Sequence, residues 1–283
     1  MSLKDDLRRV LEDTAQHDQK IMRAPNAQRR FIICEGLYKN TGLIAPLDKI
    51  VAMKHKFHYR LILDESYSFG TLGETGRGAL ELFNKRIMYD AEVVTIALEN
   101  ALGSIGGVTL GNEEVVDHQR LSGSGYCFSA ASPPFTASAA IASLNELKTR
   151  SHELMTKLND NKQYLYDKLR AFSEVQEDLI LISSDIRSPI VYLVLAECEE
   201  TQDIDESVFL SEIVRECIRR GIGTISAGQH NTRAGTQLLR AEPQPSIRMS
   251  VSAAHTKADL DFAVKVLHDS LGIVMRRYVD GEI

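Results

Sequence analysis

Short apolar runs recur along the chain and are separated by stretches of helical length. The run Phe31–Cys34 is apolar without alternation, and it ends at Glu35-Gly36. Such continuous runs are typical of parallel strands that are covered on both faces. Strands that alternate with helices favour an α/β fold. The runs that we interpret as strands are 31–34, 59–63, 93–98, 107–110, 189–195, 223–225 and 247–251.

Helical periodicity fills much of the remaining sequence. Residues 2–16 have leucines at helical spacing, and Ser2 with Asp5 has the pattern of a capping box, so an amphipathic helix is expected there. Pro46 opens a helix that runs to Phe57, because proline is favoured in a first turn. The stretch from residue 133 is the expected seam between two domains, 1–150 and 151–283. Further helices are expected at 133–172, 209–220 and 257–276.

Composition argues against several classes of protein. Of the 283 residues 43% are hydrophobic and the net charge is -6, so the chain is expected to be globular and not to bind nucleic acid. No apolar run approaches the ~18 residues of a spanning helix, so no transmembrane segment is expected in this chain. The cysteines show neither CxxC nor CxxH spacing, which argues against a metal site or a disulfide framework and favours a reducing compartment. They are Cys34, Cys127, Cys198 and Cys217.

The run 59–63 delivers an aspartate, Asp64, to the end of a predicted strand. Parallel sheets bind ligands at that edge, although an aspartate there often only caps the next turn. The run also resembles a Walker B strand, but the chain has no GxxxxGK[ST] loop to accompany it. The glycine-rich stretch 70–78 is better explained by a tight loop that needs positive φ, because Glu74 would repel a phosphate.

Arg248 lies inside an otherwise apolar run. A buried guanidinium requires an anionic partner. That partner is either a structural carboxylate or a bound anion, and the sequence favours neither.

Five ordered segments together resemble the α-oxoamine synthases. These are pyridoxal phosphate (PLP) enzymes of the aspartate-aminotransferase-like fold, fold type I, and they condense an amino acid with an acyl-CoA. The resemblance implies part of the large domain, with central and mostly parallel strands, followed by a smaller α/β C-terminal domain. The segments are Glu35-Gly36 with 42–47, Asp64-Glu65 with Gly70, 101–107, 128–134, and Arg248 with 255–256.

The resemblance assigns roles to several site residues. Asp64 would pair with the pyridine nitrogen of PLP, and Ser129 would contact its phosphate across a subunit interface. Arg248 would bind the substrate carboxylate. Two positions depart from the family: Asn100 stands where the family has its Schiff-base lysine, and Tyr67 where it has a histidine. An amide cannot form an imine, so no catalytic residue is expected in this chain.

This pattern of loss resembles one branch of the family, the long-chain-base subunit 1 of serine palmitoyltransferase, on residues 64–70, 117–122 and 125–130. The branch implies a non-catalytic subunit that pairs with a lysine-bearing long-chain-base subunit 2, which holds most of the PLP. The complex would make 3-ketosphinganine from L-serine and palmitoyl-CoA, the first step of sphingolipid biosynthesis. Small regulatory subunits are further partners that the branch allows. The expected location is the cytosolic face of the endoplasmic reticulum membrane, reached through a missing N-terminal segment or through the partner.

Two alternatives stay open at the level of sequence. A catalytically competent synthase would need an unconventional lysine, and Lys85 and Lys148 flank the lysine-free stretch. A purely structural or regulatory scaffold would need none. The resemblance also implies that the chain starts after the third strand of the sheet. It would then be a fragment or a truncated product with two unpaired sheet edges, and poorly soluble alone.

Overall fold

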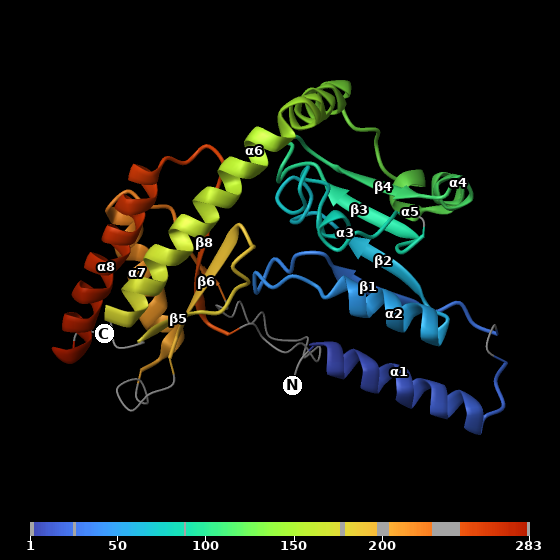
Figure 1. The fold of residues 1–283 in the computed structure, drawn as a ribbon, viewed down its shortest axis with the longest axis horizontal. Coiled ribbons are helices and arrows are strands. Elements are labelled where there is room, and N and C mark those ends of the chain that lie inside the picture. Colours follow the sequence, from blue (N-terminus) through green and yellow to red (C-terminus); the bar gives the residue numbers. More distant parts are fainter. Residues whose placement is uncertain are drawn as a thin grey trace. The chain divides into compact units, whose positions relative to one another are not determined.

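A computed structural model describes residues 3–24, 27–87, 89–175, 179–196, 204–227 and 244–281 (Figure 1). The chain forms two compact units. The first comprises Met1–Tyr38 and Ile44–Met155, and the second comprises Lys39–Leu43 and Thr156–Ile283. The division into domains at residue 150 stays a prediction.

The sheet of the first unit has its four strands in chain order. The first three strands are parallel, and the fourth is antiparallel to the third. The first and fourth strands are therefore the edges. The α/β fold class and all four predicted strands of this unit are confirmed, with shifts of one residue at some ends. The strands are β1 (Phe31–Glu35), β2 (Arg60–Asp64), β3 (Val93–Ala97) and β4 (Gly107–Gly111).

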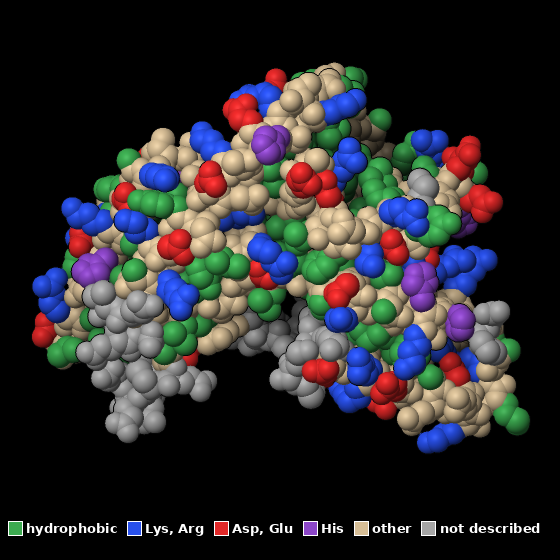
Figure 2. Space-filling view, viewed as in Figure 1, with side chains coloured by type: hydrophobic (Ala, Val, Ile, Leu, Met, Phe, Trp, Pro, Cys, Tyr) green, Lys and Arg blue, Asp and Glu red, His purple; other side chains and the backbone are tan. Residues whose placement is uncertain are grey.

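Helices cover one face of this sheet. Helix α2 (Leu47–Phe57) packs against β2, and α1 (Leu3–Lys20) packs against α2. The predicted helix from residue 2 is thus confirmed, although Ser2 lies outside the described residues. Side chains of both charge signs are interspersed over α1 and α2 (Figure 2). The buried strand residues are Ile32, Cys34, Leu61, Leu63, Val94 and Ile96.

The opposite face of β1 is open within the described residues. Phe31 is 43% exposed and Ile33 is 73% exposed. Successive side chains of a strand point to opposite faces, so packing on one face leaves every second residue uncovered. The expectation that Phe31–Cys34 is covered on both faces is therefore wrong for the described part of the chain.

A glycine-rich loop follows β2 and leads into α3 (Ala79–Leu82). Its glycines have positive φ, which confirms the prediction of a tight loop and explains why larger residues are disfavoured. The carboxylate of Glu81 holds the loop by accepting bonds from the backbone amides of Thr75 and Arg77. The glycines are Gly70 (φ 73°), Gly73 (φ 87°), Gly76 (φ 80°) and Gly78 (φ 95°).

Glu65 also holds this loop in place. Its side chain is buried at 1% exposure. It accepts hydrogen bonds from the Ser68 hydroxyl, from Ala79 N at 2.8 Å and from Leu80 N at 2.9 Å. Burial raises the pKa of the Glu65 carboxyl, and these three donors oppose that rise. A Cβ at Gly78 would lie 2.4 Å from Glu65 Oε2, so the loop backbone must approach this carboxylate closely.

The chain then passes through two short helices into a long one. Helices α4 (Glu113–Ser122) and α5 (Ser124–Cys127) contain no buried residue. They were not predicted as separate elements, because they bury no apolar stripe. The predicted helix from residue 133 is confirmed as α6 (Pro134–Val175), which is interrupted at Arg150, where φ is -119° and ψ is 19°.

The second unit contains an antiparallel sheet in the order β5-β6-β8-β7. All six residues of β6 are buried. Helices α7 (Glu206–Arg219) and α8 (Lys257–Val279) pack against each other, and a capping box of Thr256 and Asp259 starts α8. The strand predicted at 223–225 corresponds to β7, which begins at Ile225, the last of the predicted residues. The strands are β5 (Ile180–Ile182), β6 (Ile190–Leu195), β7 (Ile225–Ala227) and β8 (Ser246–Ser250).

The segment Lys39–Leu43 is bound within the second unit. The Tyr192 hydroxyl donates to the carbonyl of Lys39, and Asp185 N donates to the carbonyl of Gly42 at 3.2 Å. Gly42 has φ 67°, and a Cβ there would lie 2.6 Å from the Ile190 carbonyl. Only glycine meets both requirements without strain.

None of the helices in the described residues combines the length and low polarity needed to cross a membrane. The described cysteines, Cys34, Cys127 and Cys217, are all free. Burial raises the pKa of the Cys34 thiol to about 12 and raises that of Cys217 as well. Cys198 lies outside the described residues.

Replacing Glu65 with glutamine should weaken the anchor of this loop. The amide nitrogen of the new side chain could not accept from one of the donors that face it. We expect E65Q to lower the free energy of unfolding by about 1–3 kcal/mol in urea titrations. The exposed Glu74 supplies the control, since E74Q should change stability by less than about 0.5 kcal/mol. Equal stability of E65Q and the unmodified chain would contradict this role.

Lys162 on α6 gives a second prediction, for pH dependence. It is 6% exposed, its Nζ donates to the Arg187 carbonyl at 2.8 Å, and burial lowers its pKa from 10.5 to about 8. The unfolded chain therefore binds more protons between pH 8 and 10.5, so this lysine makes stability rise with pH across that window. The gain should approach about 3 kcal/mol.

The measurement compares K162M with the unmodified chain by urea unfolding at pH 7.5 and pH 10. The unmodified chain should gain stability relative to K162M as pH rises. K157M, which removes an exposed lysine from the same helix, should follow the unmodified chain. If the stability of K162M and that of the unmodified chain changed equally with pH, the pKa of Lys162 would not be lowered by folding.

Candidate functional site

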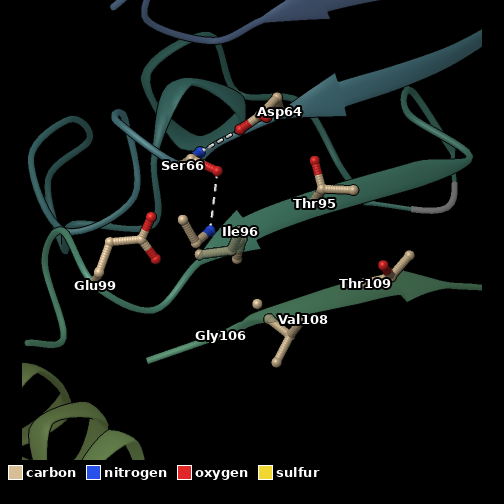
Figure 3. Close-up of a pocket in the computed structure, with 10 residues that line it drawn as sticks. Asp64, Ser66, Thr95, Ile96, Glu99, Gly106, Val108 and Thr109 are labelled. Atoms are coloured by element: carbon tan, nitrogen blue, oxygen red, sulfur yellow. Dashed lines mark hydrogen bonds between the residues drawn. The ribbon is translucent and has the colours of Figure 1, made fainter. Parts of the chain in front are cut away.

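The candidate site lies at the carboxyl ends of β2 and β3 (Figure 3). A hollow of about 290 Å³ opens there on the less covered face of the sheet. Ligands of parallel sheets bind at this edge, where the chain leaves the strands through loops. The hollow is lined by Asp64, Ser66, Thr95, Ile96, Ala97, Glu99, Gly106, Gly107, Val108 and Thr109.

Asp64 is the last residue of β2 and is half-buried. Its Oδ1 accepts a hydrogen bond from Ser66 N at 2.7 Å, which is the turn-capping role expected of an aspartate at a strand end. Its Oδ2 has no hydrogen-bond partner among the described residues. One oxygen therefore shapes the turn while the other is available to the hollow.

Ser66 connects the two loops that border the hollow. Its Oγ accepts from Ala97 N at 2.9 Å, and its carbonyl accepts from Asn100 Nδ2 at 2.8 Å. Glu65 N donates to the Thr95 carbonyl at 2.8 Å, which extends the pairing of β2 and β3 by one residue. Sequence reasoning gave Ser66 no role. Its position two residues after an aspartate is the signal of an Asx turn that could have found it.

The remaining side chains of the hollow are polar or acidic. Thr95 and Thr109 are register partners on β3 and β4 and lie side by side along the floor (Figure 3). Glu99 is exposed in the loop after β3 and was also unassigned by sequence. The lining contains no lysine, arginine or histidine. The hollow therefore carries negative charge from Asp64 and Glu99.

Other predicted site residues of the first unit lie outside the lining. Tyr67 is half-buried in the turn after β2, and Asn100 reaches the hollow only through its bond to Ser66. Ser129 is exposed just after α5. Neither Lys85 nor Lys148 lines the hollow.

Arg248 lies on β8 in the second unit. It is half-buried and faces Tyr192 and Ile225 in the register of the sheet. No carboxylate among the described residues lies within ion-pair distance of its guanidinium. The structural-carboxylate interpretation of Arg248 thus finds no support in the described part of the chain.

The lining residues meet one requirement of PLP and lack others. The Asp64 carboxylate suits a protonated pyridine nitrogen. An amine to bind the aldehyde is absent from the lining, and Glu99 adds a second negative charge where the cofactor is itself anionic. The described residues of this hollow therefore do not fit a self-sufficient PLP site.

Comparison with known proteins gives named relatives at moderate identity. Long chain base biosynthesis protein 1b of Oryza sativa subsp. japonica is 39% identical over 232 residues, which cover 82% of this chain and 46% of the relative. Serine palmitoyltransferase 1 of Dictyostelium discoideum is 34% identical over 276 residues, which cover 96% of this chain and 54% of the relative. The chain spans about half the length of these curated relatives.

Solved structures share the fold. A high-resolution structure of SPT with PLP has a TM-score of 0.73 and 24% identity, over 91% of this chain and 58% of that one. The Sphingomonas wittichii serine palmitoyltransferase has a TM-score of 0.73 and 21% identity over the same shares. Residues 4–267 match the family Aminotransferase class I and II. The predicted family is confirmed: this chain belongs to the aminotransferase class I and II proteins.

Proposed function

We propose that this chain is a non-catalytic subunit of serine palmitoyltransferase. The observation that carries the proposal is the residue at position 100. By the resemblance Asn100 takes the position of the family's lysine, and the hollow beside it is lined by Asp64 but by no amine or cation. Relatives named serine palmitoyltransferase 1 and long chain base biosynthesis protein 1b support the same assignment.

The proposed complex condenses L-serine with palmitoyl-CoA to 3-ketosphinganine. PLP, when bound, supplies an electron sink for the amino-acid carbanion. Its lysine must come from a second subunit, the long-chain-base subunit 2 of the family, which would hold most of the cofactor. Arg248, which has no acidic partner among the described residues, is the candidate for binding a substrate carboxylate in this chain.

The surface of α4 and α5 is the proposed contact with that partner. Leu121, Tyr126 and Phe128 are 82%, 68% and 89% exposed. Hydrophobic side chains are visible there among charged ones (Figure 2). Exposed clusters of large apolar residues mark interaction sites, and aromatic residues are enriched in interface cores. Ser129 follows directly, so the same contact would bring its hydroxyl to a cofactor phosphate held by the partner.

The same assignment proposes a location. The complex would lie at the cytosolic face of the endoplasmic reticulum membrane, attached through the partner. Small regulatory subunits would bind the assembled complex.

Two other functions would give different results. A competent synthase would need Lys85 or Lys148, and neither lines the hollow. A pure scaffold would leave the activity of the lysine-bearing partner unchanged when this chain is removed. Loss of serine-dependent 3-ketosphinganine formation on its removal is the result that the proposed subunit requires.

Covalent trapping tests which subunit holds the cofactor. The complex is loaded with PLP, reduced with borohydride and digested, and the peptides are analysed by mass spectrometry. We expect a stoichiometric pyridoxyl group on one lysine of the partner and none on this chain. An unreduced sample is the control. Stoichiometric label on Lys85 or Lys148 would overturn the non-catalytic assignment.

A charge in the proposed interface should separate the subunits. F128D would place a carboxylate among apolar groups that are desolvated on association, and desolvating it is costly. We expect at least about a tenfold weaker association with the partner, measured by co-purification and analytical ultracentrifugation. F262D, at a half-exposed phenylalanine on α8, is the matched control and should associate normally. Equal association of both variants would place the interface elsewhere.

A further inference from the structure

The N–H, the hydroxyl oxygen and the carbonyl of Ser66 all form hydrogen bonds where β2 and β3 end. Its N–H donates to Asp64 Oδ1, its Oγ accepts from Ala97 N, and its carbonyl accepts from Asn100 Nδ2. Figure 3 shows the first two of these bonds side by side. The serine therefore joins the turn that contains Asp64 to the loop that contains Asn100.

The geometry of the sheet explains why a serine is needed there. β2 ends at Asp64, while β3 continues to Ala97. In a longer parallel pair, a carbonyl of β2 would accept from the N–H of Ala97. The Ser66 Oγ takes the place of that carbonyl. The last amide of β3 is thus paired although its neighbouring strand has already turned away.

Asn100 completes this junction. The Ser66 carbonyl takes no part in the pairing of β2 with β3, and Asn100 Nδ2 donates to it at 2.8 Å. The loop that carries Asn100 is itself closed, because Leu98 N donates to the Gly106 carbonyl and Ser104 N to the Leu98 carbonyl, both at 2.9 Å. The amide is therefore held at a fixed place above the turn.

We propose that Asn100 is a positioning residue. Its amide donates to the Ser66 carbonyl, and Ser66 N in turn donates to Asp64 Oδ1, which fixes the Asp64 carboxylate at the edge of the hollow. The position where the family keeps a reactive amine is thus used here as a structural donor. The proposal does not depend on the identity of the reaction, because its test measures the exchange of backbone amides in this chain.

The experiment is hydrogen exchange measured by mass spectrometry on the full chain in its complex. N100D keeps the size of the side chain but replaces the donor with an oxygen that repels the Ser66 carbonyl. We expect the amides of Ser66 and Ala97 to exchange about 2- to 10-fold faster, the effect of losing one net hydrogen bond. Peptides from β6 and β8 should be unchanged. N100Q, which keeps an amide donor, should restore slower exchange.

The matched control is N145D on α6. Asn145 is exposed in the same unit, and its side chain has no hydrogen-bond partner among the described residues, so this variant adds the same charge without removing a bond. Equal exchange in N100D and N145D would overturn the proposal. If N100D does not fold, N100S carries the same expectation without a charge. Failure of the proposed role of Asn100 would not change the result of the covalent trapping experiment. The role of Asn100 and the proposed function are therefore tested separately.

Discussion

The buried carboxylate of Glu65 is the interaction on which the candidate site depends. It gathers a serine hydroxyl and two amides at the start of α3, and it draws the glycine-rich loop close over the end of β2. A carboxyl group at 1% exposure is tolerated there because hydrogen-bond donors surround it. These bonds hold the turn after Asp64 against the start of α3.

The strands and the long helices could be predicted from sequence because apolar runs and periodicity are local signals. Asp64 was located for the same reason, as a polar residue directly after a buried run. The Asx-turn spacing could have identified the turn at Ser66, but its bonds to Ala97 and Asn100, and the place of Glu99 in the lining, arise from loops that meet only in three dimensions. The open face of β1 was also unpredictable, since Phe31 and Ile33 read as buried residues whether or not anything covers them.

The candidate site combines a structural turn with a carboxylate oxygen that is available to a ligand. Asp64 Oδ2 has no hydrogen-bond partner in the part of the chain that the structure describes, and the lining of the hollow contains no amine. The Asn100 amide has a structural contact of its own, because it donates to the Ser66 carbonyl at 2.8 Å.

The short segment Lys39–Leu43 has a consequence for how the chain is made. It belongs to the second unit, although residues on both sides of it belong to the first. During synthesis it leaves the ribosome long before Tyr192, whose hydroxyl binds it. The second unit therefore cannot be completed from a contiguous piece of nascent chain. Its assembly joins early and late residues, so the second unit can be completed only after Tyr192 has been synthesised.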